Sequence, residues 1–367
     1  MPFINRLGTR GQRIAWGVVL ILMSLAPLVS TEFRLSLLAK FLALAILAIG
    51  LDLIWGYGGV LSLGHGVFFG LGAYAMAMYL KLQASGAALP DFMVWNSVTE
   101  LPWFWAIFRS FPAAFLLGIL LPGLLAFLLG LFTFRNRITG VYFTILTQAL
   151  VMIMVTLFVG KQEWTGGTNG LTGYHQIFGM ELHQPSTTIM LYYVTLLLLV
   201  LSYILCKRVV RSRFGQVLEA ARDGENRVRF LGYDPAWYKT IAFALSGALA
   251  GLAGMLFVLQ VGIISPSMMG IVPSIEMVLW VALGGRGTLV GAMIGAVVLN
   301  AAKTGISEAY PEGWLFVMGG LFVAIVLFMP KGLVGVYHSV TGKWIRKGGA
   351  PDDQSVHKRK HKQATFE

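Results

Sequence analysis

The stretch ALGGRGTLVGA at residues 282–292 lies between two apolar runs, 271–284 and 288–303, and it decides how this chain can fold. Four glycines and one arginine stand where a membrane helix would need continuous hydrocarbon side chains. Irregular backbone is tolerated at membrane depth only where protein or water surrounds it, and broken helices are typical of transport paths and moving parts. We therefore expect a hinge or gate formed by Pro273, Gly284, Gly285, Arg286 and Gly287.

The composition is that of a protein that crosses a membrane many times. Of the 367 residues, 57% are hydrophobic and 12% are charged, and the mean hydropathy is +0.74. A membrane helix needs about 20 mostly apolar residues. The predicted fold is an all-α polytopic membrane protein with about ten transmembrane or re-entrant helices. The candidate segments are 14–30, 35–55, 60–80, 111–134, 138–160, 189–206, 240–262, 271–284, 288–303 and 314–330.

The basic residues predict the orientation of these helices. If the segments alternate in direction, most of the 28 Lys and Arg residues fall on one side of the membrane. This side is expected to be the cytoplasmic one, because cytoplasmic loops carry an excess of Lys and Arg. Both termini are then cytoplasmic. The expected organisation is an N-terminal tail (1–13), a membrane domain (14–334) with a cytoplasmic loop (207–239), and a basic, disordered tail (335–367). Because the charges occupy short segments without interleaved aromatic residues, nucleic acid is not an expected partner.

Three polar residues inside the candidate segments could line a path for a polar solute: Asp52, His65 and Glu276. Ionisable groups in a membrane are costly, and they are usually functional or paired. His65 could equally satisfy a neighbouring carbonyl group, and Asp52 stands near a segment end, where the cost is smaller. Glu276 follows Pro273, which would break or kink a helix. With Arg286 ten residues later, Glu276 indicates a polar lining or a structural ion pair.

Glycine-rich stretches mark further features. Residues 56–74 form either a broken, path-lining segment or a tightly packed helix crossing. The loop 163–173 is rich in turn-forming residues, and Thr168 and Asn169 are candidates for contact with a substrate. Small residues four apart predict close packing between helices. These pairs are Gly66 with Gly70, Gly247 with Gly251, and Gly291 with Gly295.

The segment 213–235 has apolar residues at helical spacing but is too polar to span a membrane. It predicts an amphipathic helix pair, which either connects two spans or docks a cytoplasmic motor. The candidate docking residues are Glu219, Ala220, Arg222, Asp223 and Glu225.

The sequence lacks the motifs that identify several classes of enzyme. It has no phosphate-binding G-x-x-x-x-G-K-[ST] loop, no H-E-x-x-H zinc motif and no G-x-S-x-G nucleophile motif. Its single cysteine, Cys206, allows neither an internal disulfide nor a cysteine metal cluster. We therefore expect no catalytic residue, metal or cofactor in this chain, and a transport rather than an enzymatic function.

Four segments together resemble one family. They are 56–66 (GYGGVLSLGHG), 165–171 (TGGTNGL), 282–288 (ALGGRGT) and 328–333 (FMPKGL). As a set, spread over residues 36–336, they look like the longer permease subunit of the branched-chain amino acid and urea ABC importers, the LivM and UrtC type.

The resemblance implies a bacterial inner-membrane protein that forms a path with a sister permease. A periplasmic solute-binding protein would deliver the solute, and two cytoplasmic ATPases, which bind ATP and magnesium, would dock at 219–225. Segments 276–280 and 303–308 look more like the urea branch, so urea is the expected solute. A branched-chain amino acid importer is the alternative, followed by a stand-alone channel or secondary carrier.

Overall fold

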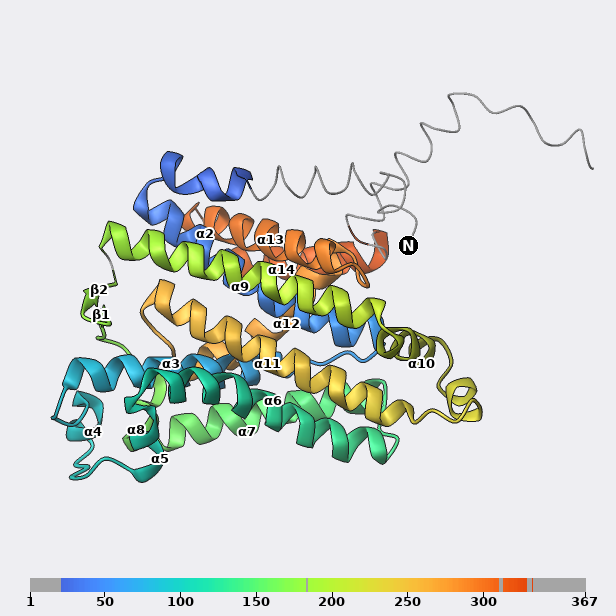
Figure 1. Cartoon of the computed structure of the whole chain (residues 1–367), viewed down its shortest axis with the longest axis horizontal. Coiled ribbons are helices and arrows are strands. Elements are labelled where there is room, and N and C mark those ends of the chain that lie inside the picture. The colour runs from blue at the N-terminus through green and yellow to red at the C-terminus, as the bar shows by residue number, and fades with distance from the viewer. Residues whose placement is uncertain (1–20, 183, 310–312, 329–331, 333–367) are drawn as a thin grey trace, which may run out of the picture.

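The computed structural model describes residues 21–182, 184–309, 313–328 and 332, and the long helices lie side by side in one bundle (Figure 1). The expected tails, 1–13 and 335–367, lie outside the described residues. Each of the ten expected segments contains a helix in its described part, although 60–80 is helical only from His65 and 138–160 only from Val141, and this confirms the all-α fold. Residues 21–29 form the first described helix, and the long elements that follow are α2 (Glu32–Asp52) with its π-helical end η1 (Leu53–Tyr57), α3 (His65–Ser85), α6 (Phe111–Arg135), α7 (Val141–Gly160), α9 (Pro185–Arg211), α10 (Arg213–Phe230), α11 (Pro235–Val261), α12 (Ile271–Gly284), α13 (Leu289–Ala309) and α14 (Gly313–Phe328).

Short elements lie mainly at the end of the bundle opposite α10 (Figure 1). The strands β1 and β2 form a small antiparallel hairpin there, in which Gln176 lies opposite Glu181. These elements are α4 (Asp91–Trp95), α5 (Trp103–Ala106), η2 (Ile107–Arg109), α8 (Gln162–Thr165), η3 (Gly167–Asn169), β1 (Gln176–Ile177), β2 (Met180–Glu181) and η4 (Pro266–Met269).

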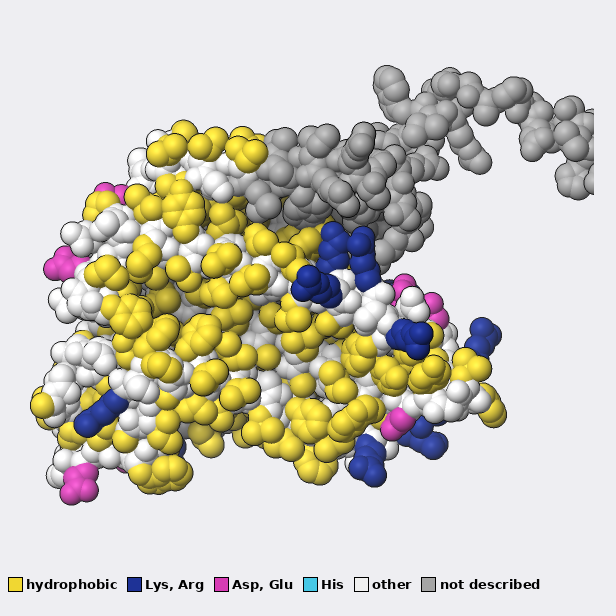
Figure 2. Space-filling view, in the orientation of Figure 1, with side chains coloured by type: hydrophobic (Ala, Val, Ile, Leu, Met, Phe, Trp, Pro, Cys, Tyr) yellow, Lys and Arg dark blue, Asp and Glu magenta, His cyan; other side chains and the backbone are white. Residues whose placement is uncertain are grey.

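Within the described part of the chain, six helical stretches are long and apolar enough to cross a membrane. They are Glu32–Tyr57, Phe111–Arg135, Val141–Gly160, Pro185–Arg211, Pro235–Val261 and Leu289–Glu308. Figure 2 shows apolar side chains over most of one face, with most of the visible basic side chains at the α10 end. The distribution is the one that a multi-pass membrane protein requires.

Helix α11 forms the centre of the bundle and packs against α2, α3 and α6. The Asp234 carboxylate accepts a hydrogen bond from the Ala236 backbone N–H and so caps its start. Small residues bring its neighbours close: Gly247 meets Ala126, and Gly251 meets the backbone of Gly118 and Gly72. The glycine pair predicted from spacing is therefore confirmed as a site of close helix packing.

Helices α12 and α13 form an antiparallel hairpin around the glycine turn at 284–288. Gly285 and Gly287 have φ of 114° and 76°, a region in which side chains other than glycine are strained. With 14 residues, α12 is about 21 Å long, which is too short for a hydrocarbon core of about 30 Å. The expected break is confirmed, and α12 has the length of a re-entrant helix.

Pro273 does not break or kink α12, contrary to the sequence prediction. It lies in the first turn of the helix, which begins at Ile271. The missing N–H of a proline costs nothing there, because the first-turn N–H groups have no partner within the helix. Pro273 therefore fits the start of a helix rather than a hinge in its middle.

Candidate functional site

Two helices begin inside the bundle, next to each other. Helix α3 starts at His65 and α12 at Ile271, each after a glycine N-cap. A side chain on Gly66 would collide with the backbone oxygen of Met269 and with Ser274, so the two helix starts touch. The glycine-rich stretch 56–74 therefore lies against the start of α12.

The loop between η1 and α3 is fixed to α7. The Leu63 N–H donates to Thr147 Oγ1 at 3.1 Å, and Thr144 Oγ1 donates to the Leu61 carbonyl at 3.0 Å. Around this junction Leu61, Leu63 and Met268 are half-buried, and Ser267 and Val272 are exposed. Two adjacent helix starts therefore reach a surface of the chain, and transporters use helix N-termini to hold anionic groups of their substrates.

His65 lies beside this junction but is occupied by structural hydrogen bonds. It is 1% exposed, with Nδ1 3.2 Å from Ser62 Oγ and Nε2 2.7 Å from Ser246 Oγ. Ser246 in turn donates to the Gly50 carbonyl at 2.5 Å. His65 therefore links α3 to α11 and α2, which favours the structural alternative considered for this residue.

Asp52 connects α2 to the glycine turn. Its Oδ1 accepts a hydrogen bond from the Gly287 N–H at 2.7 Å, and the residue is fully buried. Gly56, one helical turn later, packs directly against both groups, and no side chain fits in its place. On the outside of the turn, the Arg286 guanidinium lies 5.6 Å from the centre of the Trp55 ring. The predicted hinge is therefore seated on the end of α2.

The expected docking segment forms α10, which bends at Gly224, where φ is −170° and ψ is 83°. This bend gives the two helical parts that the sequence predicted. Glu219, Ala220 and Asp223 are exposed on the first part. The Arg222 guanidinium donates to the Gly56 carbonyl at 2.7 Å and to Asp223 at 2.8 Å. Arg222 therefore attaches α10 to the same short segment that supports the glycine turn.

The second part of α10 is attached by Glu225, which pairs with Arg229 at 2.8 Å and with Lys239 of α11 at 2.6 Å. Burial raises the pKa of Glu225, but the hydrogen bonds and charges of these two cations outweigh it, and the pKa lies below the ordinary 4.5. The hydrogen bond from Arg222 likewise holds the pKa of the Asp223 carboxyl below 3.8. Both carboxylates are therefore charged at neutral pH.

Glu276 forms a bidentate ion pair with Lys303 across the α12–α13 hairpin, with N–O distances of 2.8 and 2.6 Å. Of the two alternatives considered for Glu276, this geometry favours the ion pair. The partner is Lys303 rather than Arg286, the cation suggested by the sequence.

Thr168 and Asn169 are exposed in η3, near the β-hairpin end of the bundle and remote from α10 (Figure 1). Their loop is held to the segment after α11, because the Leu171 N–H donates to the Ile264 carbonyl at 2.8 Å. The candidate residues thus divide between two ends of the molecule. In the described part of the chain, no group of three His, Cys, Asp or Glu side chains could hold a metal ion.

The residues that connect these sites could not be predicted from the sequence. Ser246 and Thr147 are small polar residues within apolar segments, and nothing in the sequence separates them from ordinary helix residues. Lys303 is more conspicuous, since it is a cation at the last position of the expected apolar segment 288–303.

Comparison with known families identifies the architecture. The family model described as "Branched-chain amino acid transport system / permease component" matches residues 33–326. The chain belongs to this permease family. It is thus a multi-pass membrane permease of the ABC importer type, a class that works with ATPase and solute-binding partners.

Several curated relatives support this assignment. The high-affinity branched-chain amino acid permease LivM of Salmonella typhimurium is 31% identical over 311 residues, covering 79% of this chain and 67% of the relative. LivM of Escherichia coli is 28% identical over 340 residues, covering 86% and 74%. The autoinducer 2 permease LsrC of Photorhabdus laumondii is 32% identical over 143 residues, covering 36% and 41%. No solved structure matches the chain. The two LivM relatives support the amino acid alternative better than urea, the solute expected from the sequence.

Proposed function

We propose that this permease carries branched-chain amino acids across the bacterial inner membrane in partnership with a sister permease. The observation behind the proposal is the junction of α3 and α12, two helices that start side by side within the region matched to the family. Backbone N–H groups at helix starts favour an anionic group such as a carboxylate. The half-buried Leu61, Leu63 and Met268 offer an apolar rim to an aliphatic side chain.

The α10 end of the bundle faces the cytoplasm in this proposal, because basic side chains gather there. Two ATPase subunits dock on α10 and its counterpart in the sister permease, and ATP and magnesium bind to those subunits. A periplasmic binding protein docks at the opposite end, where Thr168 and Asn169 are exposed. Arg222 then lies between the docked ATPase and the glycine turn.

Uptake of radiolabelled solutes in a strain lacking the transporter tests the substrate. Restoring the full system should restore leucine uptake, and excess valine or isoleucine should compete with it. Urea uptake without leucine uptake would overturn the assignment and restore the urea prediction. Solute flux into liposomes that contain this chain alone would instead indicate a channel or secondary carrier.

Replacement of residues 219–229 with a neutral linker tests the docking surface. Co-purification of the ATPase should be lost, and a linker of equal length at 89–99, in the loop at the opposite end, serves as the control. ATPase binding that survives the replacement at 219–229 would refute the docking role of α10.

A further inference from the structure

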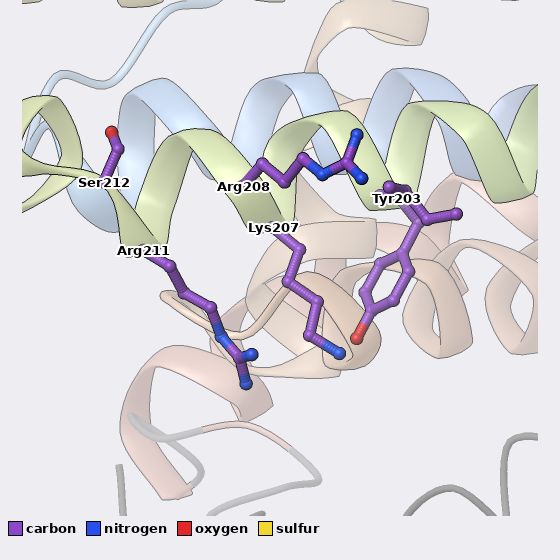
Figure 3. A pocket seen from close by; sticks show the side chains of 6 residues that line it. Tyr203, Lys207, Arg208, Arg211 and Ser212 are labelled. Carbon is purple, nitrogen blue, oxygen red and sulfur yellow. The ribbon is translucent and has the colours of Figure 1, made fainter.

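The end of α9 carries a basic depression beyond the sites described above. It is open to the surface, has a volume of about 390 Å³, and is lined by Tyr203, Ile204, Lys207, Arg208, Arg211 and Ser212. Figure 3 shows the side chains of Lys207 and Arg211 extending to the same side of α9, with the ring of Tyr203 beside Lys207. The Lys207 ammonium lies 5.1 Å from the centre of that ring.

The cations of this depression stand apart from the salt bridges formed by the described residues. Among the residues described by the structure, neither Lys207, Arg208 nor Arg211 forms a salt bridge. Cations on the adjoining α10 behave differently, since Arg222 and Arg229 each pair with a carboxylate of their own helix. The basic depression is thus distinct from the ordinary ion-paired surface beside it.

Basic residues at a helix end also have a simpler explanation, because they balance the partial negative charge of the helix C-terminus. That partial charge is about half an elementary charge. Three full positive charges within the last five residues of α9 exceed it several-fold, so a positive excess remains for an external anion.

The depression also lies at the depth of lipid headgroups. Helix α9 has 27 residues, about 40 Å at 1.5 Å per residue, which is longer than a hydrocarbon core of about 30 Å. Its apolar part precedes Lys207, so the three cations stand just beyond that core. Basic hollows of this kind beside membrane helices suit lipid phosphate groups.

We infer that Lys207, Arg208 and Arg211 bind the phosphate of an anionic phospholipid, with Tyr203 forming the floor beside its acyl chains. The depression is basic on one side and apolar on the other, because Ile204 and the Tyr203 ring adjoin the cations. A phospholipid, which has both a charged headgroup and apolar chains, fits this lining better than a soluble anion. The site also reaches Ser212, the N-cap of α10. A bound lipid would therefore sit at the joint between a membrane helix and the cytoplasmic helix.

Native mass spectrometry of the purified full-length chain tests this site. After delipidation, the chain is titrated with phosphatidylglycerol, phosphatidylcholine or inorganic phosphate. Phosphatidylglycerol should bind most tightly. The variant K207Q/R211Q should bind it about 30-fold more weakly, which corresponds to about 1 kcal/mol for each cation removed.

Two matched variants separate this site from general electrostatics. R135Q/R137Q removes two cations at the end of α6, and K207R/R211K keeps the charge of the depression; both should bind like the wild type. Equal thermal unfolding of all variants establishes that they fold. Wild-type binding by K207Q/R211Q, or equal weakening by R135Q/R137Q, would overturn the site. Displacement of the lipid by millimolar inorganic phosphate would overturn the assignment to a lipid. The test requires no transport, so its outcome is independent of the proposed function.

Discussion

Replacing Lys303 with Met tests whether Glu276 is held by a structural ion pair. The Glu276 side chain is 7% exposed and that of Lys303 is 37% exposed. Removing one partner of a buried pair costs about 3–5 kcal/mol. The partial exposure of Lys303 lowers this figure because water screens the pair, and Lys40 also lies within electrostatic range of Glu276. We expect K303M to lower the free energy of unfolding by about 2 kcal/mol.

The reverse change, E276Q, should cost less, because the Lys303 ammonium that remains can reach water. The double variant E276Q/K303M removes both charges and should unfold within about 1 kcal/mol of the wild type. Thermal unfolding of the purified protein in detergent measures the stability of all three variants. The variant K161M controls for the change from Lys to Met, because Lys161 is exposed and forms no salt bridge with the residues that the structure describes.

Leucine uptake by the same variants separates structure from transport. If Glu276 serves only to pair with Lys303, the double variant should recover uptake together with stability. A stable double variant without uptake would place Glu276 in contact with the solute, as the sequence first suggested. If the double variant is instead destabilised by the sum of the two single effects, the two residues act independently, and the ion pair does not explain either effect.

The glycine turn and α10 give two further predictions. Gly284→Ala places a methyl group against the Gly291 carbonyl and should destabilise the α12–α13 hairpin by about 2 kcal/mol, whereas Gly305→Ala points into open space and should be neutral or stabilising in thermal unfolding. Because the pKa of Glu225 lies below 4.5 in the folded protein, its pairing contributes stability above that pH, and the contribution is lost as the pH falls through the lowered pKa. The protection of α10 amides, measured as hydrogen exchange relative to the intrinsic rate at each pH, should therefore fall in acid, and E225Q should show lower protection at neutral pH and little further change; protection in E225Q that matches the wild type at neutral pH would contradict this role.

The helices and their closest contacts were predictable because the signals are local. An apolar run of about 20 residues has few folds available to it in a membrane. Glycines four apart put a groove on one helix face, and Gly247, Gly251 and Gly291 all lie at close helix contacts. Positive φ at Gly285 and Gly287 likewise follows from residue type, since a turn this tight requires it.

Partners across the bundle could not be predicted in the same way. Arg286 was considered for Glu276 because it is near in sequence, but the antiparallel hairpin places Lys303, 27 residues away, beside the carboxylate. Pro273 was predicted to break or kink a helix, although the expected segment 271–284 already has the bounds of α12 and places this proline in the first turn. A proline is compatible with a first turn and incompatible with a helix interior, so the error lay in treating Pro273 as an interior residue.

The candidate coupling and hinge residues, treated separately in the sequence, share one support in the structure. Arg222 on α10 holds the Gly56 carbonyl, and Asp52, one turn earlier, holds the Gly287 N–H, each at 2.7 Å. Gly56 fills the space between them, and any larger residue would separate Asp52 from the turn. A displacement of α10 therefore acts on the glycine turn through two hydrogen bonds and one helical turn of backbone, with no flexible linker in between. For this reason the absence of a side chain at Gly56 matters as much as the charge of Arg222.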